Sequence, residues 1–298
     1  MSIQNQPNGQ YLQRLIMLCG LFFLGLFVFT FLAAAAAVKI YGVPCEIYNL
    51  FDYIKSHPNE ARTINALIFT QVMSQITAMA VPFLVVMQVT YRDQMYSETG
   101  LLKVPKFIII LLVLVLFVAT LYPQNYLEYF NSLLFERNKE QSGFITAMIK
   151  ADNSSELLIN IAFMALLPAL CEEFFFRGGV YLLLKKLTSS VWLPAIVSSL
   201  FFAITHDQPS QIIVIFLMGL MLAFVYELTG SLWANILLHF SNNLFFVIAD
   251  YNKMDSSFDV ESTYNIFMFI FSVIIIIGVF WYLHKEKKRT ITLQDNSL

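Results

Sequence analysis

Residues 170–178 read LCEEFFFRG and stand inside a long apolar stretch of the chain. They place three ionisable side chains, Glu172, Glu173 and Arg177, within six residues. An ionisable group at the depth of a lipid bilayer costs about 2.5–3.5 kcal/mol on insertion scales, so it indicates a function or a specific partner. Glu173 and Arg177 are four residues apart, which puts them on one helix face within reach of an ion pair. Glu172 points about 100° away from them and needs a partner on another helix.

The composition of the whole chain is typical of a membrane protein. Of its 298 residues, 58% are hydrophobic and 13% are charged, and the mean hydropathy is +0.68. A soluble globular protein is usually about 45–50% apolar and about 25% charged. The net charge of −2 offers no basic surface for a polyanion, so we expect no binding to nucleic acid. The three cysteines predict neither a disulfide framework nor a cysteine metal site.

The apolar residues form long runs, which predict transmembrane helices rather than a soluble core. The runs cover residues 15–38, 64–90, 107–122, 156–184, 191–206, 212–228, 232–249 and 264–284. We therefore expect an all-α, polytopic transmembrane helix bundle of about eight spans. The first run is longer than the core of a cleavable signal peptide, which has about 7–15 residues, so we expect it to be a bundle helix. Pro82 and Pro168 predict kinks in the second and fourth helices.

Two further polar motifs lie in later apolar runs. Phe202 and His206 end the fifth run. His239 and Asn243 lie in the seventh run, and their spacing of four residues puts them on one helix face. A single histidine in an apolar helix is usually a hydrogen-bonded packing residue. A bundle that buries a glutamate, two histidines, an asparagine and an ion pair is better explained by chemistry at a shared polar site.

These residue types suit the hydrolysis of an amide bond. A desolvated glutamate such as Glu172 can deprotonate a water, and a histidine such as His206 can hold that water or pass its proton to the leaving amine. Asn243 and His239 can donate hydrogen bonds to the oxyanion of the tetrahedral intermediate. No serine or cysteine is evidently placed beside these residues as a nucleophile, so the sequence favours an activated water.

The three motifs together resemble those of a known protein family. EExxxR at 172–177, FxxxH at 202–206 and HxxxN at 239–243 have the order and membrane context of the CAAX-protease and bacteriocin-processing (CPBP, or Abi) family of intramembrane proteases. This family includes the CAAX prenyl endopeptidases of the glutamate type and bacterial proteins associated with bacteriocin immunity. The resemblance implies an eight-helix bundle with a polar catalytic cavity. In this cavity Glu172 would activate water, while the histidines and Asn243 would bind or polarise the scissile carbonyl.

The sequence leaves the dependence on a metal open. Glu172, His206 and His239 have the residue types of a His₂Glu zinc site. The three come from different helices, unlike the H-E-x-x-H motif, in which one helix presents both histidines. We therefore expect glutamate catalysis without a metal or cofactor, and we keep a divalent metal, with zinc as the first choice, as the alternative.

The chain divides by expected role into three parts. Residues 1–150 hold three helices of unassigned role, residues 151–250 the four-helix catalytic core, and residues 251–298 the last helix and a basic tail. The side of the membrane that holds both termini would carry ten Lys and Arg residues, against seven on the other side, so we expect both termini in the cytoplasm. The expected partners are the lipid bilayer and a membrane protein or lipidated peptide as substrate.

Two other functions stay open at this point. One is a polytopic transporter or proton-coupled carrier, in which the same ionisable residues form a relay, although the chain shows no inverted repeat. The other is a family scaffold or bacteriocin-immunity protein without proteolytic activity. Small residues at Gly178, Gly179 and Gly219 predict a close approach of helices in each case.

Overall fold

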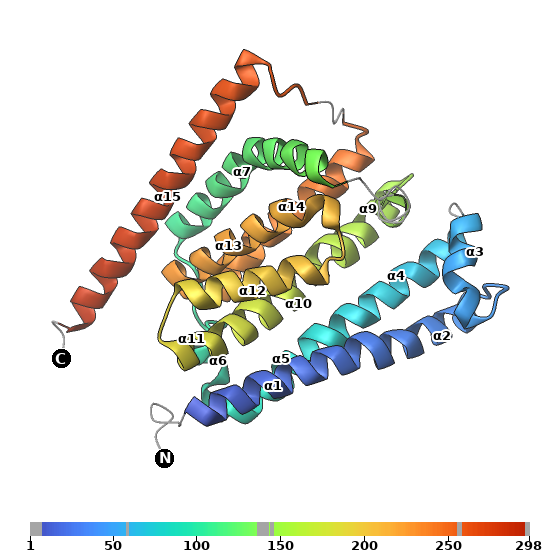
Figure 1. The fold of residues 1–298 in the computed structure, drawn as a ribbon, viewed down its shortest axis with the longest axis horizontal. Helices are drawn as coiled ribbons and strands as arrows, with labels where there is room; N and C mark the ends of the chain where they lie inside the picture. Colours follow the sequence, from blue (N-terminus) through green and yellow to red (C-terminus); the bar gives the residue numbers. More distant parts are fainter. Residues whose placement is uncertain (1–7, 58–59, 136–142, 144–145, 255–257, 296–298) are drawn as a thin grey trace. The chain divides into compact units, whose positions relative to one another are not determined.

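The computed structural model describes residues 8–57, 60–135, 143, 146–254 and 258–295. These described residues are almost entirely helical and include no β-strand, which confirms the all-α prediction. The chain divides into two compact units, each described by itself below (Figure 1). The first unit comprises Met1–Met95, Asn138–Ser189 and Asn242–Met254, and the second comprises Tyr96–Arg137, Ser190–Ser241 and Asp255–Leu298. The predicted division by role stays a prediction.

Three long helical runs build the first unit. They consist of α1 (Asn8–Leu24), η2 (Gly25–Phe29) and α2 (Thr30–Ile40); then α4 (Ala61–Gln75), η4 (Ile76–Ala80) and α5 (Val81–Tyr91); then α9 (Ser154–Asn160), η6 (Ile161–Leu166), α10 (Leu167–Glu173), η7 (Phe174–Tyr181) and α11 (Leu182–Thr188). Short helices connect or follow the first two runs, namely η3 (Ile47–Asn49), α3 (Leu50–Ser56), η5 (Arg92–Gln94) and α6 (Met95–Glu98).

Four of the described segments in the first unit, η2, η4, η6 and η7, are π-helical. Such wide turns are rare in proteins and occur often at functional sites. Two of them end shortly before a proline, η4 before Pro82 and η6 before Pro168. A proline has no N–H to donate to the preceding turn, which accounts for a π-helical turn just ahead of each proline. The kinks predicted at Pro82 and Pro168 stay predictions.

Glycines allow close helix packing in the first unit. Gly25 in η2 lies directly against the backbone of Thr77 and Ala78 in η4, where a β-carbon would not fit. Gly179 in η7 faces α1, and a β-carbon there would lie 2.9 Å from Leu18 Cδ2. The contact at Gly179 confirms the close approach predicted for that residue.

Five helices build the second unit, with η8 (Pro209–Gln211) joining two of them. They are α7 (Phe107–Leu134), α12 (Trp192–Thr205), α13 (Ile212–Thr229), residues 232–241 of α14 (Leu232–Tyr251), and α15 (Thr263–Asp295). Helix α12 packs along α13, and α7 packs along α15 (Figure 1). A β-carbon at Gly219 in α13 would lie 2.9 Å from Ser199 Cβ in α12, which confirms the close approach predicted for Gly219. The core contains Val113, Leu116, Leu222, Val225, Leu238, Val279 and Leu283.

Seven helices among the described residues are long and apolar enough to cross a membrane, and an eighth apolar helix is shorter. The seven cover Gly9–Ile40, Ala61–Glu98, Phe107–Leu134, Ser154–Thr188, Pro209–Thr229, Leu232–Tyr251 and Thr263–Leu293. The eighth, α12, has only 14 residues, whereas a bilayer crossing takes about 20. The predicted bundle of about eight apolar helices is therefore found as seven helices of spanning length and one shorter apolar helix.

Helix α7 also extends beyond its predicted end at residue 122. It continues through Pro123 to Leu134. Tertiary hydrogen bonds hold this extension, because Tyr126 donates its hydroxyl to Val260 O at 3.1 Å and Asn131 Nδ2 donates to Pro209 O at 3.3 Å. A prediction from hydropathy alone places the end of this helix at residue 122, where its polar residues begin.

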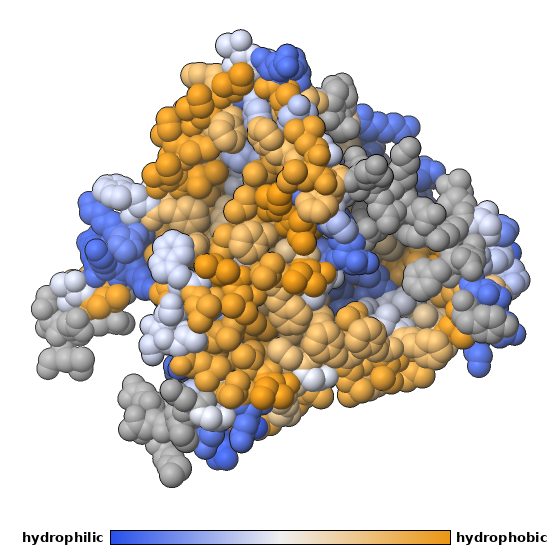
Figure 2. All heavy atoms as spheres, viewed as in Figure 1, coloured by the Kyte–Doolittle hydropathy of each residue, from blue (hydrophilic) through white to orange (hydrophobic). Residues whose placement is uncertain are grey.

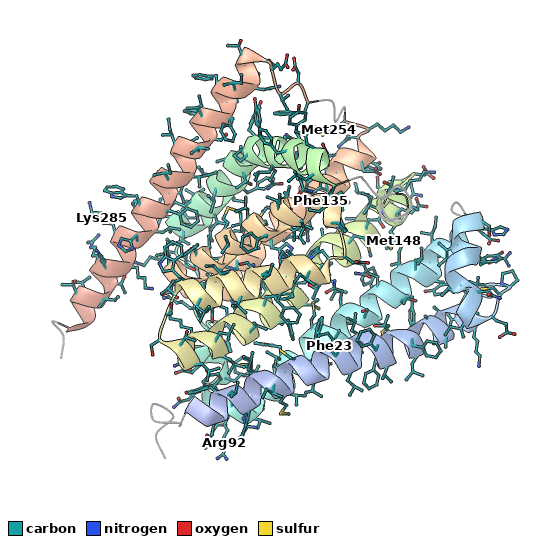
Figure 3. All side chains as sticks on the ribbon, viewed as in Figure 1. Phe23, Arg92, Phe135, Met148, Met254 and Lys285 are labelled. Carbon is teal, nitrogen blue, oxygen red and sulfur yellow. The ribbon has the colours of Figure 1, made fainter. Side chains whose placement is uncertain are left out.

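The exposed surface of the long helices is hydrophobic. Figure 2 shows hydrophobic residues along α15 and along the run of α1 and α2, with hydrophilic residues towards their ends. Large apolar side chains are exposed on both, among them Phe27, Phe31, Phe267 and Ile274. Near the C-terminal end of α15, Lys285 projects from the helix (Figure 3), and its Nζ lies 5.2 Å from the centroid of the Trp281 ring. Tryptophan and lysine are enriched at membrane interfaces, so this surface is that of a multi-pass membrane protein.

Candidate active site

The charged turn of the first unit begins at the end of α10 and continues into η7. Glu172, Glu173 and Arg177 are all buried. Arg177 Nη1 donates to Glu173 Oε1 at 3.0 Å, and both side chains are fully buried. This contact confirms the predicted ion pair, which forms although the helix becomes π-helical after Glu173. Removing one partner of such a pair leaves an uncompensated buried charge, so the pair fixes this turn firmly in place.

One residue on another helix that contacts Glu172 is Gln75, the last residue of α4. Gln75 Nε2 donates to Glu172 Oε1 at 3.1 Å, across a separation of 97 residues. The exposed fractions of Gln75 and Glu172 are 8% and 5%. The sequence analysis expected such a partner but did not find Gln75. The only sequence feature that pointed to Gln75 was its polar amide within the second apolar run. The sequence does not indicate which apolar run packs against α10.

Asn243 lies in the part of α14 that belongs to the first unit. Its Nδ2 donates to Ala165 O in η6 at 3.4 Å. In a π-helical turn the carbonyl groups depart from the regular i→i+4 hydrogen-bond pattern, so such a carbonyl is a suitable acceptor for a side chain. This hydrogen bond ties the asparagine of the third motif to the helical run that carries the glutamates of the first motif.

The two histidines belong to the second unit and contact the same aromatic ring. The ring centroid of Phe202 lies 4.5 Å from that of His206 and 5.8 Å from that of His239. His206 Nδ1 lies 2.7 Å from Phe202 O. A carbonyl only accepts hydrogen bonds, so Nδ1 carries a proton and Nε2 is the basic nitrogen of the neutral ring.

The chain reverses its direction directly after His206. Helix α12 ends at Thr205, and Asp207 adopts a φ of 50°. Aspartate tolerates this left-handed region better than most residues, and Pro209 follows two residues later. The local sequence therefore places His206 at the end of a helix, where its ring folds back over Phe202.

The predicted site residues fall into two groups. The two glutamates, Arg177 and Asn243 lie in the first unit, while His206 and His239 lie in the second. His239 and Asn243 share the continuous helix α14 and are four residues apart, so they lie on one face of it, as predicted. Within the described part of the chain, no group of three or more His, Cys, Asp or Glu residues is arranged to hold a metal ion. Metal-free catalysis nevertheless stays a prediction.

Comparison with known proteins gives a family-model match in the middle of the chain. Residues 154–245 match the family model described as type II CAAX prenyl endopeptidase Rce1-like. No significant match was found among curated proteins or among solved structures. The matched segment begins at α9, ends within α14 and contains all three motifs. Over these residues the chain is similar to the Rce1-like type II CAAX prenyl endopeptidases, which confirms the resemblance that the three motifs carried.

Proposed function

We propose that this protein is an intramembrane endopeptidase that hydrolyses a peptide bond in a membrane-associated or lipidated protein or peptide. The observation that carries the proposal is the family match over residues 154–245, which covers all three motifs. The burial of Glu172 in an apolar helical run supports it, since an ionisable residue at such a place usually serves a function.

In the proposed reaction, Glu172 acts as the general base. It takes a proton from a water whose oxygen attacks the carbonyl carbon of the scissile bond. The proton then passes to the leaving amine, so that the C–N bond breaks and the carboxylate is regenerated. His206 holds the water or shuttles the proton through Nε2, and His239 and Asn243 donate hydrogen bonds to the oxyanion.

The first substrate class to test is a prenylated peptide with a C-terminal CAAX sequence. The description of the matching family names this class, and the apolar helices around Glu172 favour a substrate with a hydrophobic or lipid-modified segment beside the scissile bond. Glu173 and Arg177 are proposed to support the turn that carries Glu172, without contact to the substrate.

The proposed reaction needs no metal or other cofactor. The alternative is zinc bound by Glu172, His206 and His239, whose imidazole and carboxylate donors suit that ion. Elemental analysis of active and chelator-treated protein separates the two. Full activity without bound metal is expected, and stoichiometric zinc that rises and falls with activity would replace the metal-free mechanism.

The central experiment compares the wild-type protein with Glu172→Gln in detergent. Both are incubated with farnesylated, geranylgeranylated and unprenylated CAAX peptides, and the products are identified by mass spectrometry. Glutamine keeps the volume of glutamate but does not act as a base, so kcat should fall far more than tenfold while KM changes little. Glu46→Gln, the same change at an exposed position outside the spans, should leave kcat unchanged.

The possible results separate the candidate functions. Cleavage by the wild type and by Glu46→Gln, but not by Glu172→Gln, supports the endopeptidase. If Glu172→Gln kept more than a tenth of the wild-type rate, the base would have to be another residue. A folded wild type that cleaves none of the peptides would favour a carrier or a scaffold.

We further propose that both termini face the cytoplasm, because Lys and Arg are more numerous on that side. The exposed position 288 near the end of α15 offers a test. With the native Cys19, Cys45 and Cys171 replaced by serine, Lys288→Cys should react with a membrane-impermeant maleimide only after cells are permeabilised. Reaction in intact cells would place the C-terminus outside.

A further inference from the structure

Helix α4 packs against α10 in the first unit (Figure 1). The last residue of α4, Gln75, reaches Glu172. The hydrogen bond from Gln75 Nε2 to Glu172 Oε1 is 3.1 Å long, and both side chains are more than nine-tenths buried. Gln75 lies outside the matched residues 154–245. The contact therefore links a helix of unassigned role to the proposed base.

The amide of Gln75 presents two different atoms to its surroundings. An ionised carboxylate only accepts hydrogen bonds, so the NH₂ group is the one that faces Glu172. Gln75 Oε1 is buried and has no hydrogen-bond donor among the described residues. An amide oxygen buried without a donor is unfavourable, so a ligand that donates a hydrogen bond to it is bound more tightly. Water is the smallest such ligand.

Contacts on both sides of Gln75 hold it in place. Thr30 Oγ1 donates to Ser74 Oγ at 2.9 Å, which fixes the residue before Gln75. Gly25 lies against the backbone of Ala78, which fixes the π-helical turn after it. A group that orients a reacting atom must itself be held by its neighbours, and these two contacts meet that requirement.

We propose that Gln75 is a positioning residue for the hydrolytic reaction. Its NH₂ group holds the carboxylate of Glu172, and its Oε1 accepts one hydrogen of the attacking water while Glu172 accepts the other. The lone pair of the water oxygen is then directed towards the substrate carbonyl. Gln75 gains and loses no proton. The proposal rests on the proposed role of Glu172 as the base, and it gives the N-terminal helices a part in the reaction.

The kinetic test compares Gln75→Met with Gln71→Met. Both changes remove an amide from α4, but Gln71 is exposed and lies one helical turn earlier. With a farnesylated CAAX peptide, Gln75→Met should lower kcat by about 10- to 100-fold and leave KM within about twofold, because positioning is lost rather than binding. Gln71→Met should match the wild type. Gln75→Asn keeps an amide but withdraws it by one carbon, so it should lose as much as Gln75→Met.

A second test needs no substrate. Dicyclohexylcarbodiimide modifies protonated carboxyl groups in apolar surroundings, and the modified residue is found by peptide mapping. The amide of Gln75 contacts one oxygen of the Glu172 carboxyl group, so without this amide the reagent should label Glu172 several-fold faster in Gln75→Met than in Gln71→Met. Glu172→Gln gives the background of the assay.

The outcomes separate the two proposals. If kcat and the labelling rate are the same in Gln75→Met and Gln71→Met, the role of Gln75 is wrong, whatever Glu172 does. If Glu172→Gln keeps its activity, the assignment of Glu172 as the base fails and the role of Gln75 fails with it, even where labelling still responds to Gln75. If the folded wild type cleaves none of the peptides, the proposed function itself fails. If Gln75→Met does not fold, as judged by size-exclusion chromatography and thermal unfolding, Gln75→Asn provides the same comparison.

Discussion

The glutamate region of the first unit and the histidine region of the second hold their polar side chains in different ways. On α10 and η7, Glu173 is held by a charged partner, Arg177, and Glu172 by an amide. On α12 and α14, both imidazoles pack against the ring of Phe202, and His206 also contacts a backbone carbonyl. Substitutions in the buried ion pair of the glutamate region should therefore destabilise the fold, whereas substitutions in the histidine region and its helix should mainly slow the reaction.

The largest effect is expected for Arg177→Met. This change leaves Glu173 fully buried without its counter-charge, which costs about 3–5 kcal/mol in comparable buried pairs. The free energy of unfolding in detergent, followed by tryptophan fluorescence, measures the loss. Glu173→Gln should act in the same direction, because it removes the carboxylate that pairs with the buried Arg177.

The double variant Glu173→Gln/Arg177→Met is the control for this prediction. It removes both charges, so it should be markedly more stable than either single variant. Equal stabilities of Arg177→Met and the wild type would show that the buried pair does not hold this region, and the contrast with the histidine region would be lost.

Asn243→Ala should act on turnover. Loss of one oxyanion donor lowers kcat by about 10²–10³, or about 2.7–4 kcal/mol of transition-state stabilisation, with little change in KM. Asn252→Ala, near the end of the same apolar run, removes an exposed amide and should leave kcat unchanged. A fall in thermal stability of Asn243→Ala that matches its loss of activity would instead assign Asn243 to the hydrogen bond with Ala165 O.

The sequence predicted those contacts that one helix makes within itself. The pair Glu173 and Arg177 and the shared face of His239 and Asn243 follow from a spacing of four residues. The contact between Gln75 and Glu172 could not be predicted, because it joins two helices 97 residues apart and periodicity carries no information on which helices pack together. The π-helical turns and the extension of α7 also depend on tertiary contacts, which hydropathy does not register.

A smaller effect is expected for Phe202→Leu. The substitution keeps most of the buried volume but removes the ring that contacts both imidazoles. Aromatic contacts contribute about 0.5–1.5 kcal/mol each, so kcat should fall several-fold through misplacement of the imidazoles. Phe201→Leu, the same change at the preceding position, serves as the control. Equal rates for the two variants would mean that packing against Phe202 does not orient the histidines.

The smallest effect concerns an ion pair in water, at Glu60 before α4. Arg62 Nε donates to Glu60 Oε1 at 2.6 Å, and this hydrogen bond holds the pKa of Glu60 at about 2, below its ordinary value of 4.5. A lowered carboxyl pKa contributes stability above the pKa of the unfolded chain, and this contribution is lost as the pH falls towards about 2. Exposed pairs contribute little, so Glu60→Gln should lower the Tm only slightly at pH 7.

This Tm difference between Glu60→Gln and the wild type should shrink as the pH falls from about 4.5 to about 2. Thermal unfolding of both proteins over this pH range measures it. If Glu60→Gln lowered the Tm as much as Arg177→Met does, or if the Tm difference grew as the pH fell, the expectation that an exposed ion pair contributes much less stability than a buried one would be wrong.

The short helix α12 connects the proposed chemistry to the thickness of the bilayer. Its 14 residues span about 21 Å at about 1.5 Å per residue, whereas the hydrocarbon core is about 30 Å thick. Its apolar face, with Trp192, Leu193 and Ile204, is exposed. The bilayer around such a short helix either becomes locally thinner or covers one end of the helix. His206 stands directly after that helix, so lipids of different acyl-chain length would change how deeply its imidazole lies below the membrane surface. The rate of the proposed reaction would then vary from one membrane to another.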